Sequence, residues 1–350
     1  MKDTHYDLLT YIYVKYKENN LKFMENYCKM IYRPDNITGG ILNLFFMSEK
    51  EMLDQLNIYP QELDVIKMLD IVNKEIHNHK LLPNDCKFVY GIEGCDYLNG
   101  PEDLVKLYEL GVRSINPVWN EKNKFGSGTR YSGGLTELGK KLIEKAVDLG
   151  IMIDVSHANE ETFWDIIELV SKLRLEGKKG IVFASHSNCR DLFDEQVNML
   201  DFNQDEINLA KKEIFYKRNL TDAQLLAIKN LDGMIGIIAH KAMSLVTIDD
   251  NDVAKKEKQK LYFEALGEQF KHIKNLFGDV DNITVASDNM EFFIPFDPVY
   301  YTNSNHFQYE NINYQFRMFL NSIGFTDLEI EKIMSSNFEN KIYDKLRKID

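Results

Sequence analysis

The sequence lacks the features that would direct a protein to a bilayer or to nucleic acid. No apolar run approaches the roughly 20 residues that span a membrane, and the densest, residues 41–47, is interrupted by Asn43. Basic residues are in deficit, with 42 Lys and Arg against 55 Asp and Glu, and the resulting net charge of −13 argues against a nucleic-acid backbone or an anionic membrane as partner. We also expect neither a secretion signal nor a lipid anchor, because Asp3 and Asp7 lie among the opening residues and the last residues are charged.

Cysteine is scarce and shows no paired spacing. The four cysteines, with no C-x-x-C among them, are expected to be reduced, buried thiols, which predicts a cytoplasmic protein. The remaining composition, 44% hydrophobic and 28% charged over 350 residues, is typical of a globular chain with one large domain or two ordinary ones.

Short β-branched runs alternate with amphipathic segments along the whole chain. The runs predict eight strands, at residues 2–5, 40–46, 87–92, 112–118, 151–155, 181–185, 234–239 and 283–287. Between them, helices are predicted at residues 101–110, 135–149, 160–175, 221–230 and 256–277. This order is typical of an α/β protein with a (β/α)₈ TIM barrel, and we interpret residues 1–350 as one such catalytic domain. Besides the barrel elements, a helical insert is predicted at about 191–217 and closing helices at about 314–347. The alternative to a barrel is an open doubly wound sheet.

Side chains with acid–base or metal-binding chemistry follow most of the predicted strands. In the first strand, His5 and Asp7 stand two residues apart, so an extended backbone points both to one face. Others follow the third, fifth, sixth and eighth strands: Glu93, His157, His186 and Asp288. Their positions at strand ends favour the barrel over the open sheet, since a barrel gathers all the carboxyl ends of its strands in one mouth.

Such a gathering predicts a metal centre. A single histidine after an apolar run is more often structural, but three histidines with carboxylates at the same mouth are the ligands that Zn²⁺ prefers. A glutamate reached from both sides can bridge two ions about 3.5 Å apart.

Seven stretches of the chain, in order, resemble the membrane (renal) dipeptidase family of zinc peptidases, which have a metallo-dependent hydrolase type of barrel. The resemblance covers nearly the whole chain. Its stretches are Asp3-Thr-His-Tyr-Asp7, Gly91-Ile-Glu-Gly94, Ser132-Gly-Gly-Leu-Thr-Glu-Leu-Gly139, Ile153-Asp-Val-Ser-His157, Ala184-Ser-His-Ser-Asn188, Arg218-Asn-Leu-Thr221 and Ala286-Ser-Asp288.

The resemblance implies a dipeptidase that cleaves small unblocked dipeptides with a hydroxide shared by two zinc ions. His5 and Asp7 would bind one ion, His157 and His186 the other, and Glu93 would bridge them. Asp288 matches the acid beside the scissile bond, where a carboxylate can accept and deliver a proton. Arg218 matches the residue that holds the substrate's C-terminal carboxylate; from the residues alone, it could equally cap or pair on the following helix.

The chain departs from the family pattern at two positions that would line the substrate pocket. Trp119 stands where many members have a Thr-His pair, and His240 stands in place of an Asn-Phe-Tyr stretch. The departures motivate two alternatives: a related binuclear-metal amidohydrolase acting on another amide, ester or lactone, and a metal-stabilised binding protein without turnover. A homodimer fits an acidic barrel with extra helices, although no particular residue argues for it.

Overall fold

Eight parallel strands form a closed barrel in the computed structural model, which describes residues 1–45, 64–192, 214–239, 243, 255–288 and 311–347. The strand order is β6-β5-β4-β3-β2-β1-β8-β7, and a parallel bridge between Ala184 and Ile235 joins the two ends of this order. The predicted (β/α)₈ barrel is confirmed, and the open doubly wound sheet is excluded. The strands are β1 (Lys2–Tyr6), β2 (Gly39–Phe45), β3 (Lys87–Glu93), β4 (Val112–Asn116), β5 (Met152–Asp154), β6 (Val182–Phe183), β7 (Ile235–Ile238) and β8 (Ile283–Ala286).

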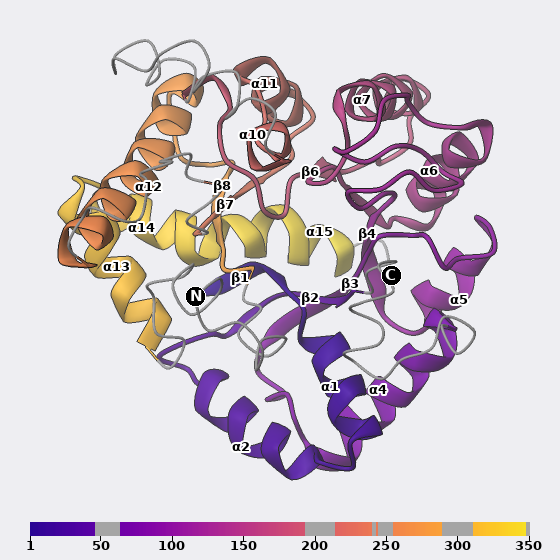
Figure 1. The fold of residues 1–350 in the computed structure, drawn as a ribbon, viewed down its shortest axis with the longest axis horizontal. Coiled ribbons are helices and arrows are strands. Elements are labelled where there is room, and N and C mark those ends of the chain that lie inside the picture. The colour runs from indigo at the N-terminus through magenta and orange to yellow at the C-terminus, as the bar shows by residue number, and fades with distance from the viewer. Residues whose placement is uncertain (46–63, 193–213, 240–242, 244–254, 289–310, 348–350) are drawn as a thin grey trace.

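Helices surround the barrel and alternate with its strands (Figure 1). Local signals set their ends: Asn159 and Thr221 accept hydrogen bonds from backbone amides of the first turn, and Gly150 ends its helix with φ of 73°. The helices that follow the strands or pack around them are α1 (Leu8–Lys17), α2 (Leu21–Ile31), α4 (Val65–His79), α5 (Asp103–Glu109), α6 (Glu137–Leu149), α7 (Glu160–Leu175), α10 (Ile214–Arg218), α11 (Asp222–Asn230) and α12 (Lys255–Phe277).

The C-terminal helical segment packs against the amino ends of the strands. Phe338, Ile342 and Leu346 form one apolar cluster with a strand residue from each of β2, β3, β5 and β6 and with Met234. Figure 1 shows this segment in yellow, crossing the molecule between α14 and α15. It comprises α13 (Ile312–Ser322), α14 (Asp327–Glu331), two π-helical turns, η4 (Lys332–Ser336) and η5 (Glu339–Tyr343), and α15 (Asp344–Arg347). The opposite end of the barrel, where the carboxyl ends of the strands lie, is therefore the end available for a site.

Three details differ from the sequence prediction. β6 has two residues instead of five, because the Ser185 amide donates to the Asp154 carboxylate rather than to a neighbouring strand. Residues 8–38, for which no helix was predicted, contain two helices, α1 and α2. Of the predicted insert at 191–217, residues 193–213 lie outside the described ranges. Among the helices described, none combines the length and the apolar character that crossing a bilayer needs.

Candidate metal centre

Six side chains predicted as site residues converge at the carboxyl ends of the strands. His5 belongs to β1 and Glu93 is the last residue of β3, while Asp7 immediately precedes α1. The others occupy the turns that follow β5, β6 and β8: His157, His186 and Asp288. Five of the six are buried, and the Asp288 side chain is 20% exposed. The barrel thus brings together residues that are up to 283 positions apart in the chain.

Glu93 stands at the centre of the group, and its two carboxylate oxygens face different partners. Oε2 lies 3.1 Å from His5 Nε2, whereas Oε1 lies 2.8 Å from His157 Nε2 and 3.5 Å from His186 Nε2. Two sets of possible metal ligands therefore share this residue: one with His5 and Asp7, the other with His157 and His186. Within each set, the ligand atoms lie within 4.8 Å of one another.

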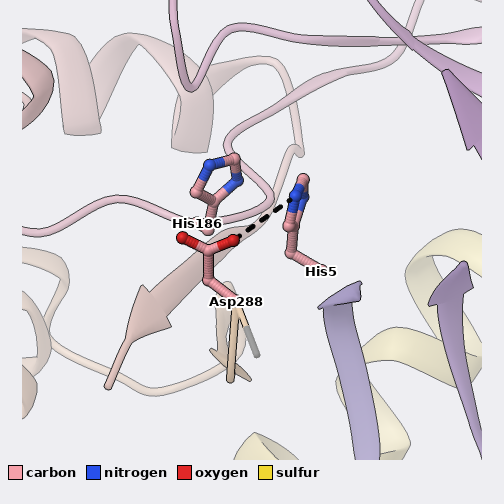
Figure 2. Close-up of side chains that lie close together, drawn as sticks. All are labelled: His5, His186 and Asp288. Carbon is pink, nitrogen blue, oxygen red and sulfur yellow. Dashed lines mark ion pairs between the residues drawn. The ribbon is translucent and has the colours of Figure 1, made fainter. Parts of the chain in front are cut away.

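Asp288 borders the side of the group nearest β1 and β6. Its Oδ1 lies 3.8 Å from His5 Nε2, and the ring centroids of His5 and His186 are 3.7 Å apart. Figure 2 shows the carboxylate and the two imidazole rings facing a common space. Asp288 reaches this position with a left-handed backbone, φ of 45°, and its amide donates to the His5 carbonyl oxygen at 3.2 Å. A non-glycine residue held in this conformation indicates that the surrounding structure constrains its direction.

Neighbouring polar groups fix the orientation of the three imidazole rings. His157 Nδ1 lies 2.9 Å from Asn120 Oδ1, and Ser185 Oγ lies 2.7 Å from His186 Nδ1 and 2.9 Å from His5 Nδ1. The Asn43 amide nitrogen is 2.9 Å from His5 Nδ1 as well. In each ring, the nitrogen that faces Glu93 is Nε2, and the outer nitrogen, Nδ1, is held by a neighbouring polar group, which is how metal-binding imidazoles are oriented.

The crowded charges shift the pKa of each group. Burial alone would lower the pKa of His5, but Glu93, Asp7 and Asp288 raise it to about 10. Burial and the charge of Glu93 raise the pKa of Asp7 well above its usual range. Burial also raises the pKa of Asp288, to about 6. Burial together with the nearby Arg218 lowers the pKa of His157 to about 3. His157 is thus neutral, the form that binds metals, among carboxylates that repel one another.

The donor set fits divalent cations. Asp7 Oδ1 is buried and has no hydrogen-bond partner among the residues the structure describes; His5 Nε2 lies 3.8 Å from it, beyond hydrogen-bond distance. A metal ion bound to this oxygen would satisfy it. Three carboxylates, two of them buried, also concentrate negative charge around three imidazoles, and both side-chain types are ligands that Zn²⁺ takes from proteins.

Arg218 and Trp119 border the group, as the sequence predicts for substrate-binding residues. Arg218, the last residue of α10, is buried; Nη2 donates to the His186 carbonyl at 3.4 Å, and Nη1 has no hydrogen-bond partner within the described ranges. Burial lowers the pKa of this guanidinium to about 10, so it stays charged. The Trp119 ring lies 5.7 Å from the His157 ring, centroid to centroid. The third predicted pocket residue, His240, lies outside the described residues.

The sequence prediction missed the residues that orient the histidines. Asn120 and Asn43 looked like ordinary strand-end and strand residues, and Ser185 and Asp154 like neighbours of the ligands. A usable signal existed for one of them, since Asp154 interrupts the apolar run of residues 151–155 three residues before His157. Its Oδ1 accepts from the Ser185 and Ser156 amides, which ties the β5 and β6 turns together.

The chain is similar to several known proteins. A 26% identical protein of Acinetobacter calcoaceticus, uncharacterised and encoded in the PQQ-III 3′ region, aligns over 236 residues, which are 65% of this chain and 62% of the relative. An uncharacterised dipeptidase of Schizosaccharomyces pombe is 23% identical over 66% of this chain and 53% of its own length. A metallopeptidase from Rhodobacter sphaeroides, solved with a phosphinate mimic of the dipeptide L-Ala-D-Ala, superposes with a TM-score of 0.61 at 17% identity over the full length of both chains, a likeness of fold.

The alignments with the first curated relatives cover about half of their lengths, from 46% to 62%. The sequence model of the membrane dipeptidases, peptidase family M19, matches residues 3–213, more than half of this chain and all of the segment that carries His5, Asp7, Glu93, His157 and His186. The chain therefore belongs to the membrane dipeptidase family, peptidase family M19.

Proposed function

We propose that the protein is a zinc-dependent dipeptidase that hydrolyses the peptide bond of small, unblocked dipeptides. One observation carries the proposal: the two oxygens of the buried Glu93 face separate imidazoles, His5 on one side and His157 with His186 on the other. A bridging carboxylate between two sets of zinc ligands is the arrangement that a binuclear hydrolase needs. The dipeptide mimic bound by the Rhodobacter sphaeroides metallopeptidase supports this substrate class.

In this proposal, His5 and Asp7 hold one zinc ion, His157 and His186 hold the other, and Glu93 bridges them. The bound ions would supply an acidified water molecule and polarisation of the scissile carbonyl. Two observations support the assignment: Asp7 Oδ1 has no hydrogen-bond partner among the described residues, and the Nε2 atoms of all three imidazoles are directed toward Glu93. The ring contacts of Asn120 and Ser185 keep those nitrogens directed at Glu93.

Asp288 is the proton carrier in this proposal. Its carboxylate lies 3.8 Å from His5 Nε2, at the edge of the ligand group, and is partly exposed where the others are buried. Burial raises its pKa to about 6, which is close enough to neutrality for the group to take a proton from water and return it to the leaving amine. It also offers an acceptor for the free amino group of the substrate.

Arg218 binds the C-terminal carboxylate of the dipeptide. The guanidinium is buried and charged beside the cluster, and its Nη1 donors lack a partner in the described structure, so a substrate carboxylate would satisfy them. Trp119, packed against the His157 ring, and His240 line the remaining pocket and determine which side chains fit. A carboxylate held at this point excludes longer peptides that extend beyond it.

The test combines metal analysis with a substrate panel. Protein purified under zinc-replete conditions is expected to hold zinc at this centre and to hydrolyse L,L and L,D dipeptides; His157→Ala should lose zinc from it and lower kcat/KM by at least a thousandfold. His77→Ala, an exposed histidine on α4, is the matched control and should change neither. Full activity in His157→Ala, or less than one zinc per chain in the parent protein, would refute the proposal.

A second candidate is a related binuclear amidohydrolase for another amide, ester or lactone. Trp119 favours it, because an indole beside His157 offers one N–H donor and a large apolar face in a position next to the reacting group. N-acyl amino acids and lactones in the same panel decide between the two. A higher kcat/KM for blocked substrates than for any dipeptide would assign this function instead.

We further propose that residues 1–350 form a single catalytic domain that works in the cytoplasm. Support for the location comes from the cysteines: all four are free thiols, and three of them are buried. A homodimer remains our proposal for the assembly, to be checked by light scattering of the purified chain.

A further inference from the structure

A second group of metal-ligand side chains lies apart from the candidate metal centre. Cys189, Asp222 and His272 place a sulfur, an oxygen and a nitrogen within 4.8 Å of one another. The Cys189 thiol donates to Asp222 Oδ1 at 3.1 Å, and His272 Nε2 lies 2.7 Å from the same oxygen. They come from three separate parts of the fold: the loop after β6, the first turn of α11, and the middle of α12. The catalytic proposal uses none of them.

We propose that these three side chains bind an additional divalent metal ion of the zinc class, which fastens the loop after β6 to α11 and α12. Thiolate, imidazole and carboxylate are the three ligand types that Zn²⁺ takes from proteins. With bonds of about 2.0–2.3 Å, tetrahedral ligand atoms stand about 3.5 Å apart. In the structure, Cys189 Sγ lies 3.1 Å and His272 Nε2 2.7 Å from Asp222 Oδ1, so each distance would have to increase by less than about 1 Å. The two hydrogen bonds would be replaced by bonds to the ion, and the thiol would lose its proton.

Burial and backbone contacts hold the ligands in place while leaving an approach for the ion. Cys189 is completely buried, whereas the side chains of His272 and Asp222 are 15% and 31% exposed. The Cys189 amide donates to Gln269 Oε1 at 2.7 Å, and Gln269 lies one turn before His272 on α12. The buried Cys189 is thus fixed from the inside, and the partly exposed side chains of Asp222 and His272 leave an approach for an ion and a water ligand.

The position of the group gives the ion a structural role. Cys189 pairs with Leu220 in a short parallel bridge, in which the Leu220 amide donates to Asn188 and the Arg190 amide donates to Leu220. This bridge joins the segment that follows His186 to the segment that follows Arg218. An ion held by Cys189 and Asp222 would strengthen the same junction and add α12 to it through His272. The additional site and the proposed binuclear centre share no ligand. The proposal of an additional metal site can therefore be tested independently of the dipeptidase proposal.

Cobalt substitution tests the site, because a thiolate bound to Co²⁺ gives an intense near-ultraviolet charge-transfer band that nitrogen and oxygen ligands do not. The full-length protein, freed of metal and without added thiols, is titrated with Co²⁺. We expect the band in the parent protein and in Cys86→Ser, a variant of a half-buried thiol elsewhere, and its loss in Cys189→Ser. Zn²⁺ should then displace the band. A folded parent protein that saturates with Co²⁺ without this band would overturn the proposal, as would an undiminished band in Cys189→Ser.

If Cys189→Ser does not fold, a variant of the partly exposed ligand His272 tests the same site. His272→Gln changes a partly exposed helical side chain and should retain the parent circular dichroism spectrum. Loss of one of three protein ligands should raise the Co²⁺ concentration for half-maximal band intensity by on the order of 100-fold. An unchanged titration midpoint in His272→Gln contradicts the site. Glu93→Gln, which alters only the binuclear centre, should leave the band intact even if the dipeptidase proposal is wrong.

Discussion

The contact between Asn120 and His157 links a single neutral side chain to the orientation of a candidate metal ligand. Asn120 Oδ1 lies 2.9 Å from His157 Nδ1 and accepts from Thr129 Oγ1 at 2.9 Å, so its amide is held from two sides. Asn120→Ala should therefore leave the fold intact and lower zinc affinity about 10- to 100-fold, measured by competition with a chelator. The exposed Asn78→Ala on α4 is the control. Equal affinities in both variants would contradict an orienting role.

Arg218 provides the residue-scale test of substrate recognition. Arg218→Lys keeps the charge but replaces a planar fork with a point charge, so the pair of hydrogen bonds to a carboxylate is lost. We expect kcat/KM to fall about 10- to 100-fold for dipeptides with a free C-terminus, corresponding to a charge-assisted hydrogen bond. Dipeptides with an amidated C-terminus should lose far less. Equal losses on both substrate types would show that Arg218 supports the fold rather than the substrate.

At the same scale, the sequence predicted the residues with distinctive chemistry and missed those that act through geometry. His5, Glu93, His157 and His186 could be predicted because histidines and acids follow several strands of one predicted barrel, whereas any one of them alone would more often be structural. Asn43 could not, since its contact with His5 depends on Gly91: a Cβ at that glycine would lie 2.0 Å from Asn43 Oδ1. The dependence of Asn43 on Gly91 follows from the pairing of these two residues in the register of β2 against β3, which the sequence alone does not reveal.

Among the elements, η5 is connected to two strands by one carboxylate. Glu339 pairs with Lys2 of β1 at 3.1 Å and with Lys87 of β3 at 2.5 Å. Burial opposes ionisation, but the two lysines lower the pKa of Glu339 below its ordinary value of 4.5. Because the folded pKa is the lower one, the pair stabilises the protein above about pH 4.5 and loses this contribution as the pH falls through the folded pKa.

Glu339→Gln should therefore lower the free energy of unfolding by about 1 kcal/mol at pH 7. The effect is this small because the carboxylate and Lys87 are partly exposed, so solvent screens their attraction. The difference from the parent protein should shrink steadily in urea titrations below pH 4.5. Glu109→Gln, which breaks an exposed pair with Lys106 on α5, is expected to change little at any pH. A difference that persists at low pH would mean that the substitution acts through packing.

All eight strands were predicted, whereas some of the connecting helices, such as α1, were not, for a physical reason. Buried parallel strands are largely apolar runs, as in β2, where every residue is buried and Asn43 is the one polar side chain. α1 has no such pattern to distinguish it, because seven of its ten residues are buried and its apolar face is hardly separated from a polar one. The π-helical turns η4 and η5 were also missed, since they preserve a helical period while shifting which residues face β3 and β8.

For the whole molecule, the barrel closes where β7 approaches the turn after β6, and Gly236 makes this approach close. A Cβ there would lie 1.8 Å from the Ser185 carbonyl oxygen and 2.4 Å from Thr4 Oγ1. Thr4 Oγ1 in turn donates to the carbonyl oxygens of Ser185 and Val285, each at 2.9 Å. The closure thus fixes Ser185, whose hydroxyl orients both His5 and His186.

Gly236→Ala should consequently reduce both the stability of the protein and its affinity for zinc, because the same backbone movement near Ser185 affects both. Backbone atoms must move to admit the methyl group, which should lower the free energy of unfolding by about 3 kcal/mol or more. The same movement should shift Ser185 and weaken zinc binding at the neighbouring histidines by on the order of tenfold. Gly100→Ala, which has no atom within 4 Å of its new Cβ, is the matched control for both measurements. If Gly236→Ala is destabilised but binds zinc with parent affinity, then closure of the barrel and geometry of the metal centre are independent, and the site is held by β1, β3 and β5 alone.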